Sequence, residues 1–202
     1  TLREFAASAA RLHVINALTD EEHPCQALAD CLTLCERWGS VRGRTIAFVG
    51  DGNNVATSIT QAATMLGMHV HVASPDGYQL SQMAVQQAAH AARHGARIRL
   101  FVDPSDAVSG ADAVYTDTWT SMGQEAEAEA RRKVFEPYQV DDELMSAAKP
   151  DAVFMHCLPA HRGEEVTHDV LESRASIVFD QAENRLHCQK ALLAMLLAPT
   201  SM

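Results

Sequence analysis

The sequence predicts an α/β fold in which helices cover both faces of an open parallel sheet. Short apolar runs such as residues 45–49 and 113–116 recur along the chain and are typical of buried strands. Stretches with apolar residues at three- and four-residue spacing separate most of these runs and are typical of amphipathic helices. Strands that alternate with helices pair in parallel through right-handed crossovers. The predicted class is therefore a doubly wound, Rossmann-like sheet.

Six apolar segments are the predicted strands of this sheet. They are residues 45–49, 70–73, 98–102, 113–116, 152–155 and 176–179. A further short strand is predicted at residues 14–16. Open α/β sheets bind ligands at the carboxyl edge of their strands, so the residues after each run are the first candidates for a site.

Helices are predicted between the strands and at both ends of the chain. The best marked one covers residues 24–38, because Pro24 suits a first helical turn and Gly39 suits the end. Thr19 or Asp20 is its predicted cap. The other predicted helices are residues 2–11, a helix from the turn at 50–54 to residue 65, residues 81–94 and residues 181–197.

Residues 121–137 interrupt this alternation. Residues 124–133 are highly charged and have little to bury, which favours a solvated helix or insertion. A second interpretation is a mobile lid beside the site, because Ser121, Met122 and Gly123 begin the segment.

The composition indicates a globular protein in a reducing compartment. Apolar residues make up 47% of the 202 residues, and the formal net charge of −10 disfavours nucleic acid or an anionic membrane as partner. The five cysteines are odd in number and form no Cys-x-x-Cys pair, so we expect a cytoplasmic protein. No apolar run is long enough to span a bilayer. Because the chain begins with Thr1, we expect a processed product or a fragment.

The residues after the run 152–155 are the most informative in the chain. His156, Cys157, Leu158 and Pro159 put an imidazole, a thiol and bent backbone at the carboxyl edge of the sheet. Pro159 ends the strand ladder and fixes the turn. Taken alone, Cys157 fits a buried thiol better than a functional one.

Two other segments offer polar groups to a small substrate. His23 and Gln26 lie three residues apart in the first turn of a predicted helix. The amino end of a helix favours developing negative charge, so this pair suits the polarisation of a carbonyl, although His23 taken alone fits a surface or cap residue better. Asp117 follows a strand and suits an ammonium group, although it also suits a plain turn.

The turn at residues 50–54 resembles a dinucleotide-binding turn but lacks its third glycine. Val55 stands where the Gly-x-Gly-x-x-Gly pattern requires that glycine, so a nicotinamide-dependent oxidoreductase is only a minor alternative. The amides of Asn53 and Asn54 suit a zwitterionic small molecule better than a pyrophosphate.

The ten histidines do not form a recognisable metal site. His69 and His71 share a strand face, but no third ligand has suitable spacing. His90 and His94 lie one helical turn apart without the glutamate of a metalloprotease pattern. We therefore expect no metal.

Four segments together resemble the signatures of the transcarbamoylase family, in its ornithine carbamoyltransferase branch. They are residues 50–54 with Ser58, residues 117–123, residues 156–167 and residues 182–187. They occur in the family's order over nearly the whole chain. The combination of Ser-Met-Gly with His-Cys-Leu-Pro separates this branch from the aspartate enzymes.

The resemblance implies transfer of the carbamoyl group of carbamoyl phosphate to the δ-amine of L-ornithine, which gives L-citrulline and phosphate. It implies no metal and no organic cofactor. The catalytic residues would be His23, Asp117 and Cys157. The residues that it implies for ornithine are Asn54, Asp117, Ser121, Met122, Cys157 and Leu158. Those that it implies for carbamoyl phosphate are His23, Gln26, Cys157, Leu158 and Arg185.

The resemblance also implies a division of the chain. Residues 1–38 look like a remnant of the carbamoyl-phosphate domain, residues 39–180 like the ornithine-binding domain, and residues 181–202 like a helix that returns to the first domain. The family's Ser-x-Arg-Thr-Arg phosphate loop is missing, so we expect either a fragment of a full enzyme or a gene product that has lost a domain. Full-length members are trimers, which implies a homo-oligomer. A non-catalytic amino-acid-binding module is the alternative from another functional class.

Overall fold

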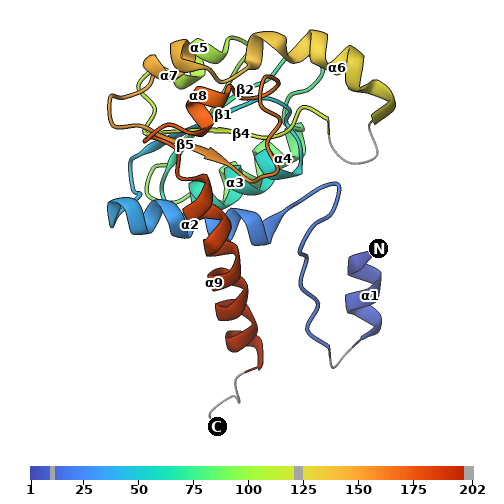
Figure 1. The fold of residues 1–202 in the computed structure, drawn as a ribbon. Helices are drawn as coiled ribbons and strands as arrows, with labels where there is room; N and C mark the ends of the chain where they lie inside the picture. The colour runs from blue at the N-terminus through green and yellow to red at the C-terminus, as the bar shows by residue number, and fades with distance from the viewer. Residues whose placement is uncertain (10–11, 121–124, 198–202) are drawn as a thin grey trace.

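A five-stranded parallel sheet forms the centre of the protein (Figure 1). The computed structural model describes residues 1–9, 12–120 and 125–197. The spatial order of the strands is β3-β2-β1-β4-β5, and each neighbouring pair is parallel. The strands are β1 (Thr45–Val49), β2 (His69–Ala73), β3 (Ile98–Phe101), β4 (Ala113–Thr116) and β5 (Val153–His156). The order changes direction between β1 and β4, and such a switch point opens a crevice at the carboxyl ends of the strands.

Helices cover both faces of this sheet, as Figure 1 shows. One face carries α2 (Pro24–Trp38), α3 (Asn54–Met65), α4 (Gln82–Ala91) and α9 (Val178–Leu197). The other carries α5 (Pro104–Val108), α6 (Ala128–Phe135), α7 (Asp142–Ser146) and α8 (His168–Leu171). Short 3₁₀ turns, η1 (Glu125–Glu127) and η2 (Glu136–Tyr138), flank α6. The predicted doubly wound α/β class is confirmed.

Burial on both faces explains why β1, β4 and the edge strand β5 can be recognised in the sequence. Each residue of β4 and β5 is buried, and β1 is buried from Ile46 onward. A strand that packs against helices on both sides has no solvent face, so its sequence is a continuous apolar run. The edge strand β3 is partly exposed and less apolar.

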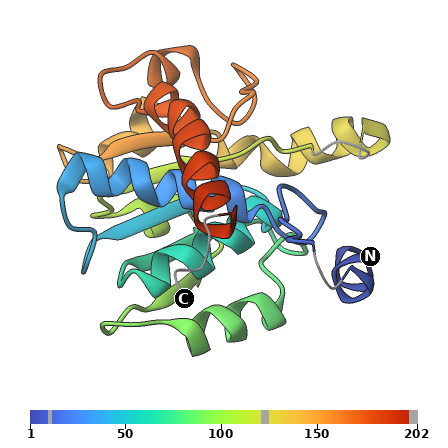
Figure 2. The ribbon, with the colours of Figure 1, turned by 90° about the horizontal axis from the view of Figure 1, so that it is seen from below.

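Two helices extend beyond the packed layers. The first, α1 (Leu2–Ser8), has no buried residue and lies apart from the sheet in Figures 1 and 2. The second, α9, crosses α2 and then leaves the domain, so that Met195 near its end is 80% exposed (Figure 2). In the described part of the chain, no helix combines the length and apolarity needed to cross a membrane.

Two of the predicted strands are wrong. Residues 14–16 are irregular backbone. The sixth predicted strand forms a single isolated bridge, between Ser176 and Phe154, because α9 already begins at Val178. A segment that turns into a helix after one bridge has the same apolar composition as a strand, so the sequence does not separate the two.

Some helix ends also differ from the prediction. The N-cap of α2 is His23 rather than Thr19 or Asp20. The Thr19 hydroxyl instead closes a short turn ahead of the helix by accepting a hydrogen bond from the backbone of Glu22. The elements α1, α4 and β3 end earlier than predicted.

Candidate active site

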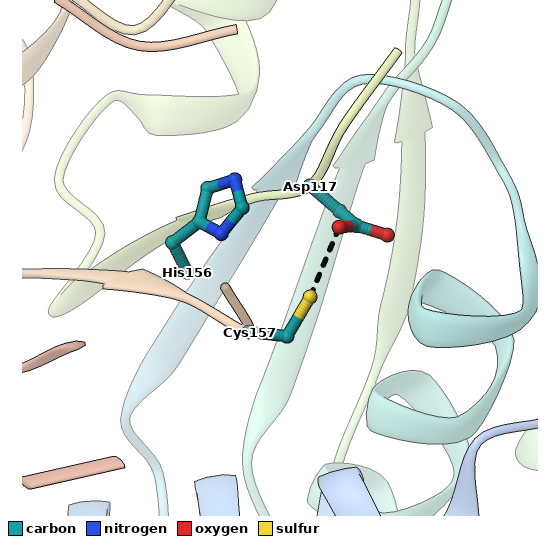
Figure 3. A group of neighbouring side chains, drawn as sticks. All are labelled: Asp117, His156 and Cys157. Atoms are coloured by element: carbon teal, nitrogen blue, oxygen red, sulfur yellow. Dashed lines mark hydrogen bonds between the residues drawn. The ribbon is translucent and has the colours of Figure 1, made fainter. Parts of the chain in front are cut away.

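The polar segments singled out in the sequence meet at the carboxyl ends of β1, β4 and β5. Asp117 directly follows β4, and Cys157 directly follows β5. Their side chains point toward each other, as Figure 3 shows, and the Cys157 thiol donates a hydrogen bond to Asp117 Oδ1 at 2.9 Å. The structure therefore brings together two of the residues that the sequence predicted for one site.

Asp117 has no cationic partner among the described residues. Its side chain is buried, and its second oxygen, Oδ2, accepts a hydrogen bond from the Asn53 amide at 2.8 Å. Both donors are neutral, and no salt bridge to Asp117 is found in residues 1–9, 12–120 and 125–197. A buried carboxylate without a counter-charge is costly, since the effective desolvation penalty is several kcal/mol per ion. The arrangement therefore suits a ligand that brings its own ammonium group.

The two adjacent asparagines have different roles in the structure. Asn53 caps α3, because its Oδ1 accepts hydrogen bonds from the backbone of Val55 and Ala56, and this turns its amide nitrogen toward Asp117. Asn54, the residue predicted for ornithine, donates its amide nitrogen to the carbonyl of Thr19 at 2.7 Å. Sequence reasoning thus missed Asn53 as the neighbour of Asp117. Its position between a strand end and a helix start was the available signal.

Packing explains the second glycine of the turn after β1. A Cβ atom at Gly52 would lie 2.3 Å from the backbone nitrogen of Leu80, and the Gly52 N–H donates to the carbonyl of Tyr78 at 2.7 Å. The turn is therefore pressed against another backbone segment. This supports the view that the glycines here do not indicate a dinucleotide site.

The thiol of Cys157 is protonated near neutral pH. Burial raises its pKa well above the usual value, and the negative charge of Asp117 raises that pKa further. A thiolate would be the better nucleophile or metal ligand, but this environment favours the neutral form. Cys157 therefore acts as a hydrogen-bond donor in the structure.

His156 shapes the loop that follows β5. Its Nδ1 accepts a hydrogen bond from the Leu158 backbone at 2.8 Å, so the ring carries its proton on Nε2, which lies 3.1 Å from the fully buried carboxylate of Glu165. Asp117, His156 and Cys157 have potential ligand atoms within 4.8 Å of one another. Because both ring nitrogens of His156 are already engaged, this set does not fit a metal ion.

His23, Gln26 and Arg185 form a second polar group beside the first. Arg185 Nη1 donates to Gln26 Oε1 at 2.6 Å, and the His23 backbone donates to Ser58 Oγ at 2.7 Å. Two buried nitrogens, His23 Nδ1 and Arg185 Nε, have no partner among the described residues. Burial and the charge of Arg185 lower the pKa of His23, so its ring is neutral at pH 7. A hydrogen bond with the Ala17 backbone and the charge of Asp117 oppose this fall in the pKa.

A buried arginine anchors the charged segment after β4. Arg131 is 3% exposed and forms an ion pair with Asp51 in the turn after β1. Its Nε donates to the carbonyl of Trp119, and its guanidinium lies over the rings of Tyr78 and Phe135, at 4.8 and 5.2 Å. The prediction of a solvated helix therefore holds for most of α6, in which only Arg131 and Phe135 are buried. Nothing in the sequence distinguished Arg131 from its charged neighbours.

The predicted lid and two of the predicted ligand residues are not tested by the structure. Ser121 and Met122 lie outside the described residues. Their role in binding, and the lid that they would begin, stay predictions.

Comparison with known proteins gives the same assignment along almost the entire chain. Residues 42–196 match the family described as "Aspartate/ornithine carbamoyltransferase, Asp/Orn binding domain". Residues 1–36 match its companion, "Aspartate/ornithine carbamoyltransferase, carbamoyl-P binding domain". The ornithine carbamoyltransferase of Symbiobacterium thermophilum is 57% identical over 190 residues, which is 94% of this chain.

Solved structures agree with these sequence matches. The ornithine carbamoyltransferase of Pyrococcus furiosus superposes with a TM-score of 0.90 at 56% identity and covers 95% of this chain. That of Gloeobacter violaceus gives a TM-score of 0.90 at 45% identity and covers 98%. The chain spans 61% of the S. thermophilum and P. furiosus proteins and 66% of the G. violaceus protein. By these matches, the chain belongs to the aspartate/ornithine carbamoyltransferase family.

Proposed function

We propose that this chain supplies the ornithine-binding part of an ornithine carbamoyltransferase. The reaction would transfer the carbamoyl group of carbamoyl phosphate to the δ-amine of L-ornithine and give L-citrulline and phosphate. The observation that carries the proposal is the buried Asp117 carboxylate, which has two neutral donors and no cationic partner among the described residues. An amino-acid substrate would provide the missing ammonium group.

The two polar groups of the candidate site suit the two substrates. For ornithine, we assign Asp117 to the α-ammonium, Asn54 with Ser121 and Met122 to the α-carboxylate end, and Cys157 with the Leu158 carbonyl to the δ-amine. For carbamoyl phosphate, we assign His23, Gln26 and Arg185, with Cys157 and Leu158 beside the carbamoyl group. The unpartnered nitrogens of His23 and Arg185 support this assignment, because carbamoyl phosphate offers acceptor oxygens to the Arg185 N–H and both an acceptor oxygen and an NH₂ donor to the His23 ring.

The chemistry requires a neutral amine and a stabilised oxyanion. An alkylamine with a pKa of about 10.4 must lose a proton at pH 7, which costs roughly 4.6 kcal/mol. The free amine then attacks the carbamoyl carbon, the C–O bond to phosphate breaks, and the amine proton ends on the departing phosphate. His23 and Arg185 would stabilise the developing oxyanion. Since Cys157 is a thiol, we assign the Leu158 carbonyl as the acceptor that orients the amine.

The wider organisation of the enzyme is part of the same proposal. Residues 39–180 would form the ornithine-binding domain, and residues 1–38 and 181–202 would belong to the carbamoyl-phosphate side. The active form would be a homotrimer in the cytoplasm. The family matches on either side of residue 40 support the first of these boundaries, and the match to the Asp/Orn binding domain continues to residue 196.

Calorimetric titration of the purified chain with L-ornithine and with L-norvaline tests the binding part. Norvaline keeps the α-ammonium and α-carboxylate and lacks the δ-amine, so both ligands are expected to bind. If the Asp117→Asn variant binds neither ligand, the assignment of Asp117 to the α-ammonium group is supported. Absence of binding by the folded wild-type chain, and also by the full-length protein that carries it, would refute the proposal.

Citrulline formation separates the enzyme from the alternative of a non-catalytic amino-acid-binding module. The full-length protein that carries this chain is expected to convert ornithine and carbamoyl phosphate to citrulline and phosphate. Ornithine binding without any citrulline would favour the binding module instead.

A further inference from the structure

Asp30 is a buried carboxylate outside the residues assigned to either substrate. It lies in the second turn of α2 and is fully buried. Its Oδ1 accepts hydrogen bonds from the amides of Gln26 and Gln181, both at 2.7 Å, and its Oδ2 accepts one from the Tyr115 hydroxyl at 3.1 Å. These three donors come from α2, α9 and β4. One side chain thus connects three elements that surround the candidate site.

Each glutamine also accepts a hydrogen bond from a residue of the candidate site. Gln26 Oε1 accepts a hydrogen bond from Arg185 at 2.6 Å, and Gln181 Oε1 accepts one from the backbone N–H of His156 at 3.1 Å. His156 is the last residue of β5 and directly precedes Cys157. Asp30 therefore connects with the proposed carbamoyl-phosphate group on one side and with the proposed ornithine group on the other.

The charge of Asp30 determines which way both amides face. An ionised carboxylate only accepts hydrogen bonds, so each glutamine must turn its NH₂ group toward Asp30. The amide oxygens then face Arg185 and the His156 N–H, which are donors. If the charge were removed, an amide could turn its NH₂ group toward one of these donors, and both contacts with the site would weaken.

We propose that Asp30 is a positioning residue for carbamoyl transfer, which holds Gln26 against Arg185 and, through Gln181, fixes the end of β5 next to Cys157. This inference rests on the proposed function, because the activity that Asp30 would support is carbamoyl transfer.

The position of Asp30 also makes the arrangement sensitive to pH. Burial raises the pKa of Asp30 to about 7, and the hydrogen bonds from Gln26, Gln181 and Tyr115, with the charge of Arg185, oppose that rise. The other titratable groups that it influences are Cys31 on α2, Cys157 after β5 and Cys188 on α9. Above pH 7 the carboxylate is ionised and accepts the hydrogen bonds from both glutamines. Below pH 7 it gains a proton, and these hydrogen bonds weaken. Activity is therefore expected to fall as the pH falls through about 7.

The test compares Asp30→Asn with Thr33→Val in the full-length protein that carries this chain. Thr33 lies one turn further along α2, is buried, and accepts a hydrogen bond from Asn184 of α9, so its variant disturbs the same helix pair without touching either glutamine. Asp30→Asn is expected to lower kcat at least tenfold at pH 8 and to abolish the additional fall in activity near pH 7, which leaves only the pH dependence set by deprotonation of the substrate δ-amine. Thr33→Val is expected to keep both kcat and the pH profile. A wild-type kcat and pH profile in Asp30→Asn, or an equal loss in both variants, would overturn the proposal.

A second measurement separates this inference from the proposed function and does not depend on folding of the variant. In the wild-type chain of 202 residues, the side-chain NH₂ resonances of Gln26 and Gln181 are followed by NMR from pH 5.5 to 8.5. Both are expected to shift together with a midpoint near 7. Side-chain amide resonances that do not shift between pH 5.5 and 8.5 would overturn the role of Asp30, even if the protein makes citrulline. If the wild-type protein makes no citrulline, the proposed function fails, and with it the positioning role, whatever the resonances show.

Discussion

At the level of single residues, Asp117 is held by the Cys157 thiol and the Asn53 amide and by no cation among the described residues. Its negative charge is therefore suited to binding a ligand and does not stabilise the free protein. Residues that serve a ligand in this way commonly reduce stability, and their replacement separates the two properties.

Asp117→Asn is expected to weaken the binding of ornithine and norvaline by about 3 kcal/mol, roughly 100-fold or more. The thermal midpoint of the free chain is not expected to fall, because the variant removes an uncompensated buried charge. Calorimetric titration and thermal unfolding monitored by circular dichroism measure the two effects. A large fall in the midpoint together with unchanged affinity would contradict the assignment.

Cys157 is expected to react slowly with iodoacetamide at pH 8, because burial and the charge of Asp117 raise its pKa. Removal of that charge in Asp117→Asn lowers the pKa again, so the reaction at Cys157 should become faster. Peptide mapping by mass spectrometry gives the rate at each cysteine. Cys188 serves as the internal control, because Asp117 is not among the groups that shift its pKa. An unchanged rate at Cys157 in the variant would show that Asp117 does not control the thiol.

At the level of elements, the turn after β1 depends on the close approach of two backbone segments. Gly52→Ala would place a Cβ atom 2.3 Å from Leu80 N, and such overpacking typically costs about 1–3 kcal/mol. Gly43→Ala is the control. Its backbone has a φ of +74°, in contrast to that of Gly52, and its Cβ would meet open space, so only a conformational cost of about 1 kcal/mol is expected. Urea unfolding of both variants should show a larger loss in the free energy of unfolding for Gly52→Ala than for Gly43→Ala.

The helix α6 depends in a similar way on Arg131. Arg131→Met leaves the largely but not fully buried Asp51 carboxylate without its partner, which is expected to cost about 3 kcal/mol. The double variant with Asp51→Asn should recover most of that loss. Arg132→Met removes the neighbouring ion pair with Glu164. Because Arg132 is exposed, no measurable change in the free energy of unfolding is expected for this variant. Equal losses for the two arginine variants in urea unfolding would contradict the anchoring role.

At the level of the whole molecule, the sequence predicted the layers better than the contacts. The strands β1, β4 and β5 were found because strands buried on both faces give continuous apolar runs. The same signal failed at residues 176–179, where the chain makes one bridge and then becomes α9.

The site was predicted only as far as position along the chain determines it. Residues directly after a strand, such as Asp117 and Cys157, must lie at the carboxyl edge. Three other residues matter because of partners that lie far away in sequence. Arg131 pairs with a residue 80 positions away, Asn53 with one 64 positions away and Asp30 with one 151 positions away. No local pattern carries that information.

The isolated position of α1 has a consequence for amide hydrogen exchange. The seven residues of α1 are held by their own capping box and bury nothing, and a helix of that length is marginal in water. Its amide protons should exchange with solvent deuterium within seconds to minutes, whereas those of Phe48 and Val114 in the central strands should exchange only when the whole domain opens. In a mass-spectrometric exchange experiment, the first residues would therefore take up deuterium before the sheet takes up any.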